Sequence, residues 1–259
     1  MQASDLQQKI DNLTACSPLK AWSVIVTILG DLCQGRSDRI AGRDLNALTA
    51  RMGLTPATLR VALHRLKRDG WTESERRGRD AAYRLSSMGW KETQTVRDRI
   101  YGAGPAQDAQ LHLLIAPPHL TSAEITTALP GDAMMVAPRT AVLAGALPVL
   151  PDGMWISRID AAGPPQWLCD IIAPPELRND YACLAAAASG LLSSPAPADI
   201  ADATALRLLT LHHWRRLRLR HGDLPDILLG DTWEGATARR VVMRVLERFA
   251  RPALNELSA

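Results

Sequence analysis

Apolar residues follow helical spacing over the first third of the chain. The segment from Leu19 to Cys33 is mostly apolar, and Ser17 with Pro18 before it predicts an N-cap followed by a first-turn proline. A second, shorter helix is predicted over Arg43–Met52, where leucines three positions apart mark one face. Gly53 then stands where helices commonly end in the left-handed conformation. We expect two helices here, and the first should be largely buried.

A third helix is predicted directly after this glycine. Thr55 and Pro56 repeat the pattern of an N-cap and a first-turn proline. The apolar positions that follow lie on one helical face: Leu59, Ala62, Leu63 and Leu66. Asp69 and Gly70 end the pattern. Two short helices joined by a tight turn predict a helix-turn-helix.

Two strand-length segments come next. Trp71–Arg77 and Ala81–Leu85 flank a short loop, 78–80, that contains a glycine, and this arrangement predicts a β-hairpin. Ser86 or Ser87 then caps a helix that reaches about Tyr101. A helix-turn-helix followed at once by a hairpin is the element order of a winged helix, which we expect over residues 1–101.

The middle of the chain mixes segments of strand length and helix length. Apolar runs of strand length lie at Leu111–Ala116, Ala133–Ala137, Met154–Ile159 and Trp167–Ile172, and helix-like stretches at Ser122–Leu129 and Pro175–Leu192. This alternation predicts a small α+β domain over residues 106–193, for which we favour a ferredoxin-like arrangement.

The last part of the chain is predicted to be a helical domain over residues 198–259. Two helices, Asp199–Arg220 and Thr232–Leu257, flank a loop that contains Leu224 and Pro225. Linkers rich in glycine, proline or serine at 102–105 and 193–197 separate the three predicted domains. The expected fold class is therefore α+β.

Composition adds little to this picture, whereas the distribution of charge adds more. Apolar residues make up 47% and charged residues 22% of 259 positions, a balance that supports a globular core. The net charge is only +3, but between Arg51 and Arg84 basic residues outnumber acidic ones by nine to four. A basic segment of this kind indicates contact with nucleic-acid phosphates.

The cysteines and the apolar runs bear on the cellular compartment. The four cysteines are far apart and form no CxxC pair, so we expect reduced, mostly buried thiols: Cys16, Cys33, Cys169 and Cys183. No apolar run is long enough to span a bilayer, and the first residues lack the pattern of a secretory signal. We expect a cytoplasmic protein without a membrane partner.

The third helix carries the candidate DNA contacts on the side opposite its apolar stripe. Candidates for contacts to base edges are Ala57, Arg60, Val61, His64 and Arg68. Candidates for phosphate contacts lie on the flanks of the helix: Thr55, Thr58, Arg65 and Lys67. The hairpin adds Arg76, Arg77 and Arg79, which can reach a minor groove or the backbone.

The sequence gives only weak signals for catalysis or for metal or cofactor binding. No HExxH, GxSxG, P-loop or paired-carboxylate motif is present, and we expect no catalytic residue, metal or cofactor. The segment 214–220 is a second basic stretch, either a solvated helix face or a site for an anionic effector or DNA. Two rivals stay open: a thioesterase-like or nuclease-like enzyme with a DNA-tethering head, and a winged helix that binds a protein.

The sequence also resembles the PaaX family of phenylacetate-catabolism repressors. The matching elements are Ile25–Asp31, Leu59–Leu66, Asp69–Trp71, Gly78–Arg79, Tyr83–Leu85 and Gly89, then Leu143, Gly145, Gly153–Trp155, Trp214–Arg216, Asp223–Pro225, Leu228–Leu229 and Trp233–Ala238. Gly230 and Glu234 depart from the family pattern, which has proline at both positions.

The resemblance implies the winged-helix, ferredoxin-like and helical layout, a homodimer and a palindromic operator of double-stranded DNA. It further implies release from DNA by a small-molecule effector, an aryl-acetyl-coenzyme A thioester such as phenylacetyl-CoA. As candidate effector contacts we take Trp155, Arg158, Trp214 and Arg215.

Overall fold

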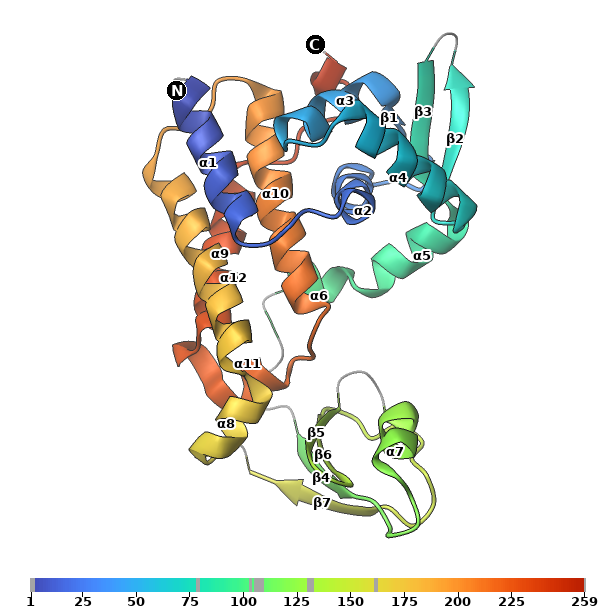
Figure 1. The fold of residues 1–259 in the computed structure, drawn as a ribbon, viewed down its shortest axis with the longest axis vertical. Helices are drawn as coiled ribbons and strands as arrows, with labels where there is room; N and C mark the ends of the chain where they lie inside the picture. Colours follow the sequence, from blue (N-terminus) through green and yellow to red (C-terminus); the bar gives the residue numbers. More distant parts are fainter. Residues whose placement is uncertain are drawn as a thin grey trace. The chain divides into compact units, whose positions relative to one another are not determined.

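The computed structural model describes residues 3–77, 80–102, 104, 110–129, 133–160 and 163–258 (Figure 1). It divides into two compact units. The first consists of Met1–Gly102, Cys183–Arg216 and Arg239–Ala259, and the second of Ala103–Ala182 and Leu217–Ala238. One boundary follows Gly102, and the other three fall inside helices of the C-terminal half.

The elements alternate between helix and antiparallel sheet. The α-helices are α1 (Ala3–Ala15), α2 (Ala21–Leu32), α3 (Gly42–Arg51), α4 (Pro56–Arg68), α5 (Ser87–Thr95), α6 (Arg97–Tyr101), α7 (Ser122–Ala128), α8 (Gln166–Ile172), α9 (Pro175–Ser193), α10 (Ile200–Arg218), α11 (Leu224–Leu229) and α12 (Glu234–Arg248). The strands are β1 (Ile40–Ala41), β2 (Thr72–Arg77), β3 (Asp80–Leu85), β4 (Leu111–Ile115), β5 (Met134–Ala137), β6 (Thr140–Ala144) and β7 (Trp155–Ile159), and two short 3₁₀ turns are η1 (Gly230–Thr232) and η2 (Glu256–Ser258). The α+β class is confirmed at this level.

Several sequence-based boundaries were wrong. Helix α2 begins after Lys20 instead of being capped by Ser17, and no side chain caps it. The run predicted as a strand at 167–172 is helix α8, which starts directly after Pro165. The loop expected around Leu224 holds the short helix α11. Strands β1 and β6 were not predicted at all.

The first unit contains a three-stranded antiparallel sheet in the order β1-β3-β2. Strands β2 and β3 pair over their full length, from Thr72 opposite Leu85 to Arg77 opposite Asp80. The two-residue strand β1, just before α3, pairs with β3 through Ile40 opposite Tyr83. Because α3 begins directly after β1, this pairing attaches the start of α3 to the β2–β3 hairpin.

Helix α2 is the core element of the first unit. Its side chains from Ser23 to Leu29 are all buried, and it packs against α4. It also contacts α10, where Thr27 Oγ1 lies 3.3 Å from His212 Nδ1. Figure 1 shows α2 end-on between these two helices. The apolar run that predicts a buried helix is thus placed correctly, apart from its N-terminus.

A buried ionic centre joins α2 to the C-terminal part of this unit. The Asp31 carboxylate has no exposed surface and accepts hydrogen bonds from Arg207 Nε at 2.7 Å and Arg251 at 3.0 Å. The Tyr101 hydroxyl donates to the same carboxylate at 2.8 Å. The two guanidinium groups keep the pKa of Asp31 below its usual value, although burial opposes this.

The second unit contains a four-stranded antiparallel sheet in the order β5-β6-β4-β7. Helix α7 connects β4 to β5, and residues 145–154, which connect β6 to β7, contain no helix. The core on one side of this sheet is built from Leu111, Val142, Ile172 and Leu224. Helices α8 and α11 therefore cover the sheet.

Aromatic rings and a buried arginine complete the second unit. Trp233 packs edge-on against Tyr181, and its ring lies 2.1 Å from the position that a Cβ on Gly235 would occupy. Only glycine fits there. Arg218 Nη1 pairs with Asp226 at 2.7 Å, and its side chain is 1% exposed. Of the two alternatives for the basic stretch 214–220, a solvated helix face is wrong for Arg218, because two carboxylates, Asp226 and Asp223, hold its guanidinium inside.

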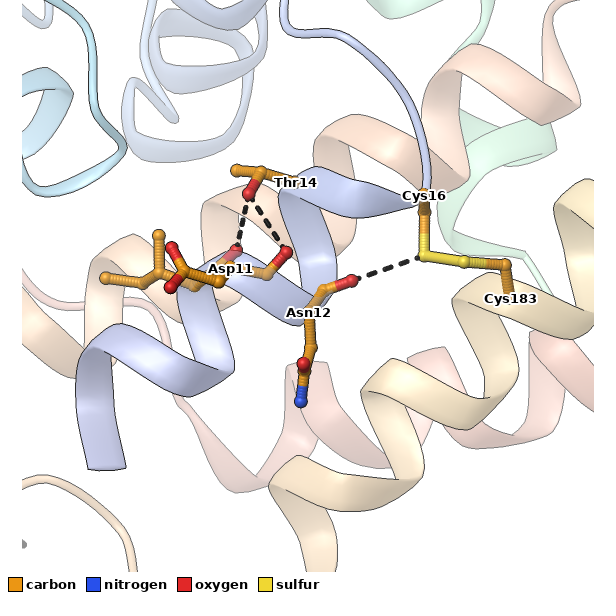
Figure 2. The surroundings of a disulfide bond; sticks show 6 residues. Asp11, Asn12, Thr14, Cys16 and Cys183 are labelled. Carbon is orange, nitrogen blue, oxygen red and sulfur yellow. Dashed lines mark hydrogen bonds between the residues drawn. A yellow bond between two sulfur atoms is a disulfide. The ribbon is translucent and has the colours of Figure 1, made fainter. Parts of the chain in front are cut away.

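A disulfide links Cys16 at the end of α1 to Cys183 on α9, 167 positions apart (Figure 2). The expectation of four reduced thiols was wrong for this pair. Cys33 and Cys169 are free and buried, as expected. Spacing along the chain gave no sign of the bond, because only the fold brings α1 beside α9.

The described ranges contain neither a candidate membrane span nor a candidate metal centre. No helix there is long and apolar enough to cross a membrane. No group of three or more histidine, cysteine, aspartate or glutamate side chains in those ranges is arranged to hold a metal ion.

Candidate nucleic-acid interface

The turn between α3 and α4 is closed by backbone hydrogen bonds. The N–H of Gly53 donates to Ala50 O at 3.0 Å, and the N–H of Leu54 donates to Thr49 O at 3.0 Å. Gly53 has φ +80°, the left-handed conformation that glycine adopts at low cost. The predicted helix end is confirmed, and this turn fixes where α4 begins.

Helix α4 is capped and anchored as the sequence predicts. Thr55 is the N-cap, and its Oγ1 accepts a hydrogen bond from the N–H of Thr58 at 3.2 Å. The predicted apolar stripe faces the core: Leu59, Ala62, Leu63 and Leu66 are 9% exposed or less. Because this face is buried, the opposite face of α4 is turned outward.

The outward face carries the candidates for base contacts. Val61, an apolar residue, is 72% exposed. Ala57, Arg60, His64 and Arg68 are exposed as well. Within the described ranges, neither Arg60 nor His64 has a hydrogen-bond or ion-pair partner. This face therefore offers a guanidinium, an imidazole and an apolar side chain with free contact surface.

The candidates for phosphate contacts are exposed, but most have local partners. Arg65 shares Asp69 with Arg68, one of the candidates for base contacts, and the Nε to carboxylate distances are 3.4 Å for Arg65 and 3.1 Å for Arg68. Lys67 Nζ donates to Ser74 Oγ at 3.1 Å. Such exposed contacts are weak and exchange readily with an incoming phosphate. Thr55 and Thr58 are also exposed at the start of the helix.

Two hollows flank α4. One, of about 490 Å³, lies between α4 and β2 and is lined by Arg60, His64 and Lys67 together with Ser74 and Tyr83 among others. This juxtaposition follows from the hairpin packing directly after the helix. The hollow places three of the candidate side chains around a single concave surface.

The other hollow, of about 750 Å³, contains a residue that the sequence reasoning missed. Trp22, in the first turn of α2, is 38% exposed and lines this hollow with Val61 and Arg65. The apolar run beginning near Leu19 suggested burial for the whole segment. The first turn of a helix often protrudes beyond its packing partner. The place of Trp22 in the first turn of α2 was therefore the available sign that its side chain is exposed.

The side chain of only one of the three candidate hairpin arginines lies among the described residues. Arg76 is exposed, but Arg84 pairs with Glu73 on the facing strand at 2.6 Å, and Arg39 pairs with Glu75 at 2.9 Å. The side chain of Arg77 and the whole of Arg79 lie outside the described residues. Of the three hairpin arginines, Arg76 alone can thus be placed.

The candidate effector residues belong to different units. Trp155, 60% exposed, and Arg158 lie on β7 in the second unit. Trp214 and Arg215 lie on α10 in the first unit. Trp214 is 1% exposed and donates its indole N–H to Ile100 O at 2.8 Å, so its side chain is part of the core. Arg215 is half-buried and borders a hollow.

Comparisons with known proteins agree with the element order. The profile of the PaaX-like protein family matches residues 20–89, and that of the PaaX-like protein C-terminal domain matches residues 175–259. The transcriptional repressor PaaX of Escherichia coli strain K12 is 25% identical over 292 aligned residues, which cover 97% of this chain and 87% of that protein. The structure of the uncharacterized protein Rv0674 from Mycobacterium tuberculosis superposes on this one with a TM-score of 0.51 at 17% sequence identity. The superposition covers 89% of this chain and 95% of that chain, so the two proteins share a fold. The two profiles together span more than half of the sequence, so the chain belongs to the PaaX family.

Proposed function

We propose that this protein is a transcriptional repressor that binds duplex DNA through the outward face of α4. The observation that carries the proposal is the division of α4 into a buried apolar stripe and an exposed face where Arg60 and His64 have no partner within the described ranges. A helix anchored on one side and free on the other can lie in a major groove, which admits one α-helix.

The side chains suit the chemistry of base edges. Arg60 can make a bidentate contact to guanine, and Val61 and Ala57 can contact a thymine methyl group. Arg65, Lys67 and Arg76 supply cations for phosphates on either side of the groove. In this assignment the thymine methyl group gives the exposed Val61 side chain an apolar contact.

The proposed layout is a winged helix over residues 1–101, a ferredoxin-like domain over 106–193 and a helical domain over 198–259. The order α3, α4, β2, β3 supports the winged helix. The sheet order β5-β6-β4-β7 with α7 after β4 supports a ferredoxin-like arrangement that lacks the helix between its last two strands. The match of a C-terminal family profile supports a separate role for the last part.

The proposed target is the operator of a phenylacetate-type catabolic operon, bound by a homodimer and released by an aryl-acetyl-CoA effector. The name of the E. coli relative supports repression, and the family resemblance supports the effector class. Release requires that the effector prefer the conformation that does not bind DNA, and couplings of about 1–3 kcal/mol are typical. No catalytic role is proposed.

A titration of the full-length protein against labelled duplexes tests the proposal. One duplex carries the DNA upstream of its own gene, and the control is a scrambled duplex of equal length. We expect preference for the first duplex and an affinity that falls about 10³-fold or more between 50 and 200 mM salt if six or more phosphates are contacted. Equal, salt-insensitive binding to both duplexes would favour a protein-interaction module instead.

A further inference from the structure

The hollow between α4 and β2 is lined by side chains that can bind an anion. The lining side chains with cationic or hydroxyl chemistry include Arg60, His64 and Lys67 on α4, Ser74 on β2 and Tyr83 on β3. About 180 Å³ of this hollow is open to water-sized groups, whereas one water needs roughly 10–15 Å³. A phosphate group therefore fits in it together with bound water.

Strand pairing determines the hairpin side of the hollow. Ser74 lies directly opposite Tyr83 in the β2–β3 register, and directly opposed residues of an antiparallel pair lie on the same face. The Tyr83 ring packs beside the start of α3, where its Cε2 lies 3.4 Å from the position that a Cβ on Gly42 would occupy. Lys67 Nζ reaches across from α4 and donates to Ser74 Oγ at 3.1 Å. Lys67, Ser74 and Tyr83 thus come together although they belong to three elements.

The hollow carries an excess of positive charge. Glu73 supplies the only carboxylate among its described lining residues, and Arg84 Nε and Nη2 donate to that carboxylate at 3.0 and 2.6 Å. The Lys67 ammonium group pairs with no carboxylate of the described residues, because its partner is the neutral Ser74 hydroxyl. The Tyr83 hydroxyl has no hydrogen-bond partner in the described part of the chain. A cation without a counter-charge beside a free hydroxyl donor favours an anionic oxygen.

We propose that this hollow holds one phosphate of the DNA backbone, bound by the Lys67 ammonium group and the Tyr83 hydroxyl, and that Tyr83 is a further DNA-binding residue. The inference rests on the proposed function, in which α4 lies in the major groove. Lys67 and Ser74 are exposed, so a backbone phosphate can enter the hollow from the surface.

The place of this phosphate gives it a role in orienting α4. Arg60 and His64 border the same hollow, so the phosphate lies beside the side chains proposed to reach base edges. Phosphate contacts set the register and orientation of a protein on the duplex and carry no sequence information themselves. A phosphate held between α4 and the hairpin therefore sets how deeply the helix enters the groove.

Fluorescence anisotropy of the full-length protein with upstream DNA and with a scrambled duplex, over a series of salt concentrations, tests the two side chains. Lys67→Met, on the exposed side of α4, should lower the slope of log affinity against log salt by about 0.9, the value for one phosphate. Tyr83→Phe removes only the hydroxyl and should weaken binding to both duplexes at least about threefold without changing the preference between them. Arg244→Met, which removes an exposed cation on α12 outside the hollow, should change neither quantity.

Duplexes that carry a single methylphosphonate locate the phosphate. This substitution removes the charge of one phosphate and leaves the bases intact, and it is placed at each backbone position of the upstream duplex in turn. At the position held in the hollow, the wild type should bind at least about threefold more weakly than it binds the unmodified duplex. Lys67→Met and Tyr83→Phe should lose less at this position, because each already lacks part of the same contact. At other contacted positions the variants should lose as much as the wild type.

Circular dichroism checks that the variants fold, and the exposed Lys67→Met keeps the test decisive if Tyr83→Phe does not fold. The proposal is overturned if the folded variants bind both duplexes as the wild type does with an unchanged salt slope. It is also overturned if the effects of variant and methylphosphonate simply add at every position. In either case a wild-type preference for upstream DNA would leave the proposed function standing. Equal and salt-insensitive binding of both duplexes by the wild type would instead overturn the proposed function, and this site with it.

Discussion

Asp31, Arg207 and Arg251 meet in one buried ionic centre although 176 and 220 positions separate the aspartate from the two arginines. No spacing in the sequence links them, and charged residues are ordinarily expected at the surface. The exposed face of α4 could be predicted, because a helical stripe of four apolar residues also defines its opposite side. The exposure of a side chain could be predicted where the spacing of nearby residues determines it, as on α4. It could not be predicted where a partner distant in sequence determines burial, as for Asp31.

The buried histidines on α10 give the molecule a defined pH dependence. His212 and His213 are each 1% exposed, and burial lowers the pKa of His212 to about 3 and that of His213 to about 4. In the unfolded chain each histidine has a pKa of about 6.5, so below that pH the unfolded state binds protons that the folded state does not. The free energy of unfolding therefore falls as the pH falls through this window, by about 2 kcal/mol per histidine at pH 5.

Urea unfolding at pH 7.5 and pH 5.0, followed by circular dichroism, measures this loss. His213→Leu should remove its share of the difference between the two pH values, whereas His119→Gln, which changes an exposed histidine, should not. A His213→Leu variant with the full wild-type pH dependence would show that this histidine does not titrate as described.

Among the elements, cap and turn residues were better signals than short apolar runs, although the cap predicted at Ser17 was wrong. Thr55, Gly53 and Ser86 each take the predicted role at a helix end. The run at 167–172 became a helix, because a short apolar run fits a strand and a buried helix equally well. Pro165, at its N-cap, was the available sign of a helix start. Strand β6 was missed because no glycine marks the tight turn before it, where Arg139 adopts φ +59°.

Two glycines test how the α3–α4 turn is held. Gly53→Ala should lower the free energy of unfolding by about 1–2 kcal/mol, because alanine is strained at positive φ. No atom lies within 4 Å of the added Cβ, so steric clash contributes nothing. Gly190→Ala, in the interior of α9 and equally unobstructed, should instead raise it by up to about 1 kcal/mol. Equal effects in urea unfolding would contradict the conformational explanation.

At the scale of the whole molecule, the domains predicted along the chain differ from the compact units of the structure. The sequence indicates three consecutive domains. The two compact units instead alternate along the chain, and the first is built from three separate segments. Helices α9, α10 and α12 each belong to both units, and linkers read from composition cannot reveal this. The three-domain layout stays a prediction, to be judged by which fragments fold alone.

The disulfide Cys16–Cys183 should stabilise the oxidised protein, since it closes a loop of 167 positions in the unfolded chain. We expect dithiothreitol to lower the free energy of unfolding by about 2–5 kcal/mol. The double variant Cys16→Ser with Cys183→Ser should match the reduced protein and be indifferent to the reductant. An oxidised wild type no more stable than this variant would contradict a formed bond.

The central claim is that the outward face of α4 selects the DNA sequence, and fluorescence anisotropy with two duplexes tests it most directly. The wild type, the double variant Arg60→Ala with His64→Ala, and the control Arg244→Ala are titrated with upstream DNA and with a scrambled duplex at one salt concentration. Since each base contact discriminates by about 1–3 kcal/mol, the double variant should lose at least about tenfold in preference while the control keeps it. A double variant that retains the wild-type preference would contradict the account.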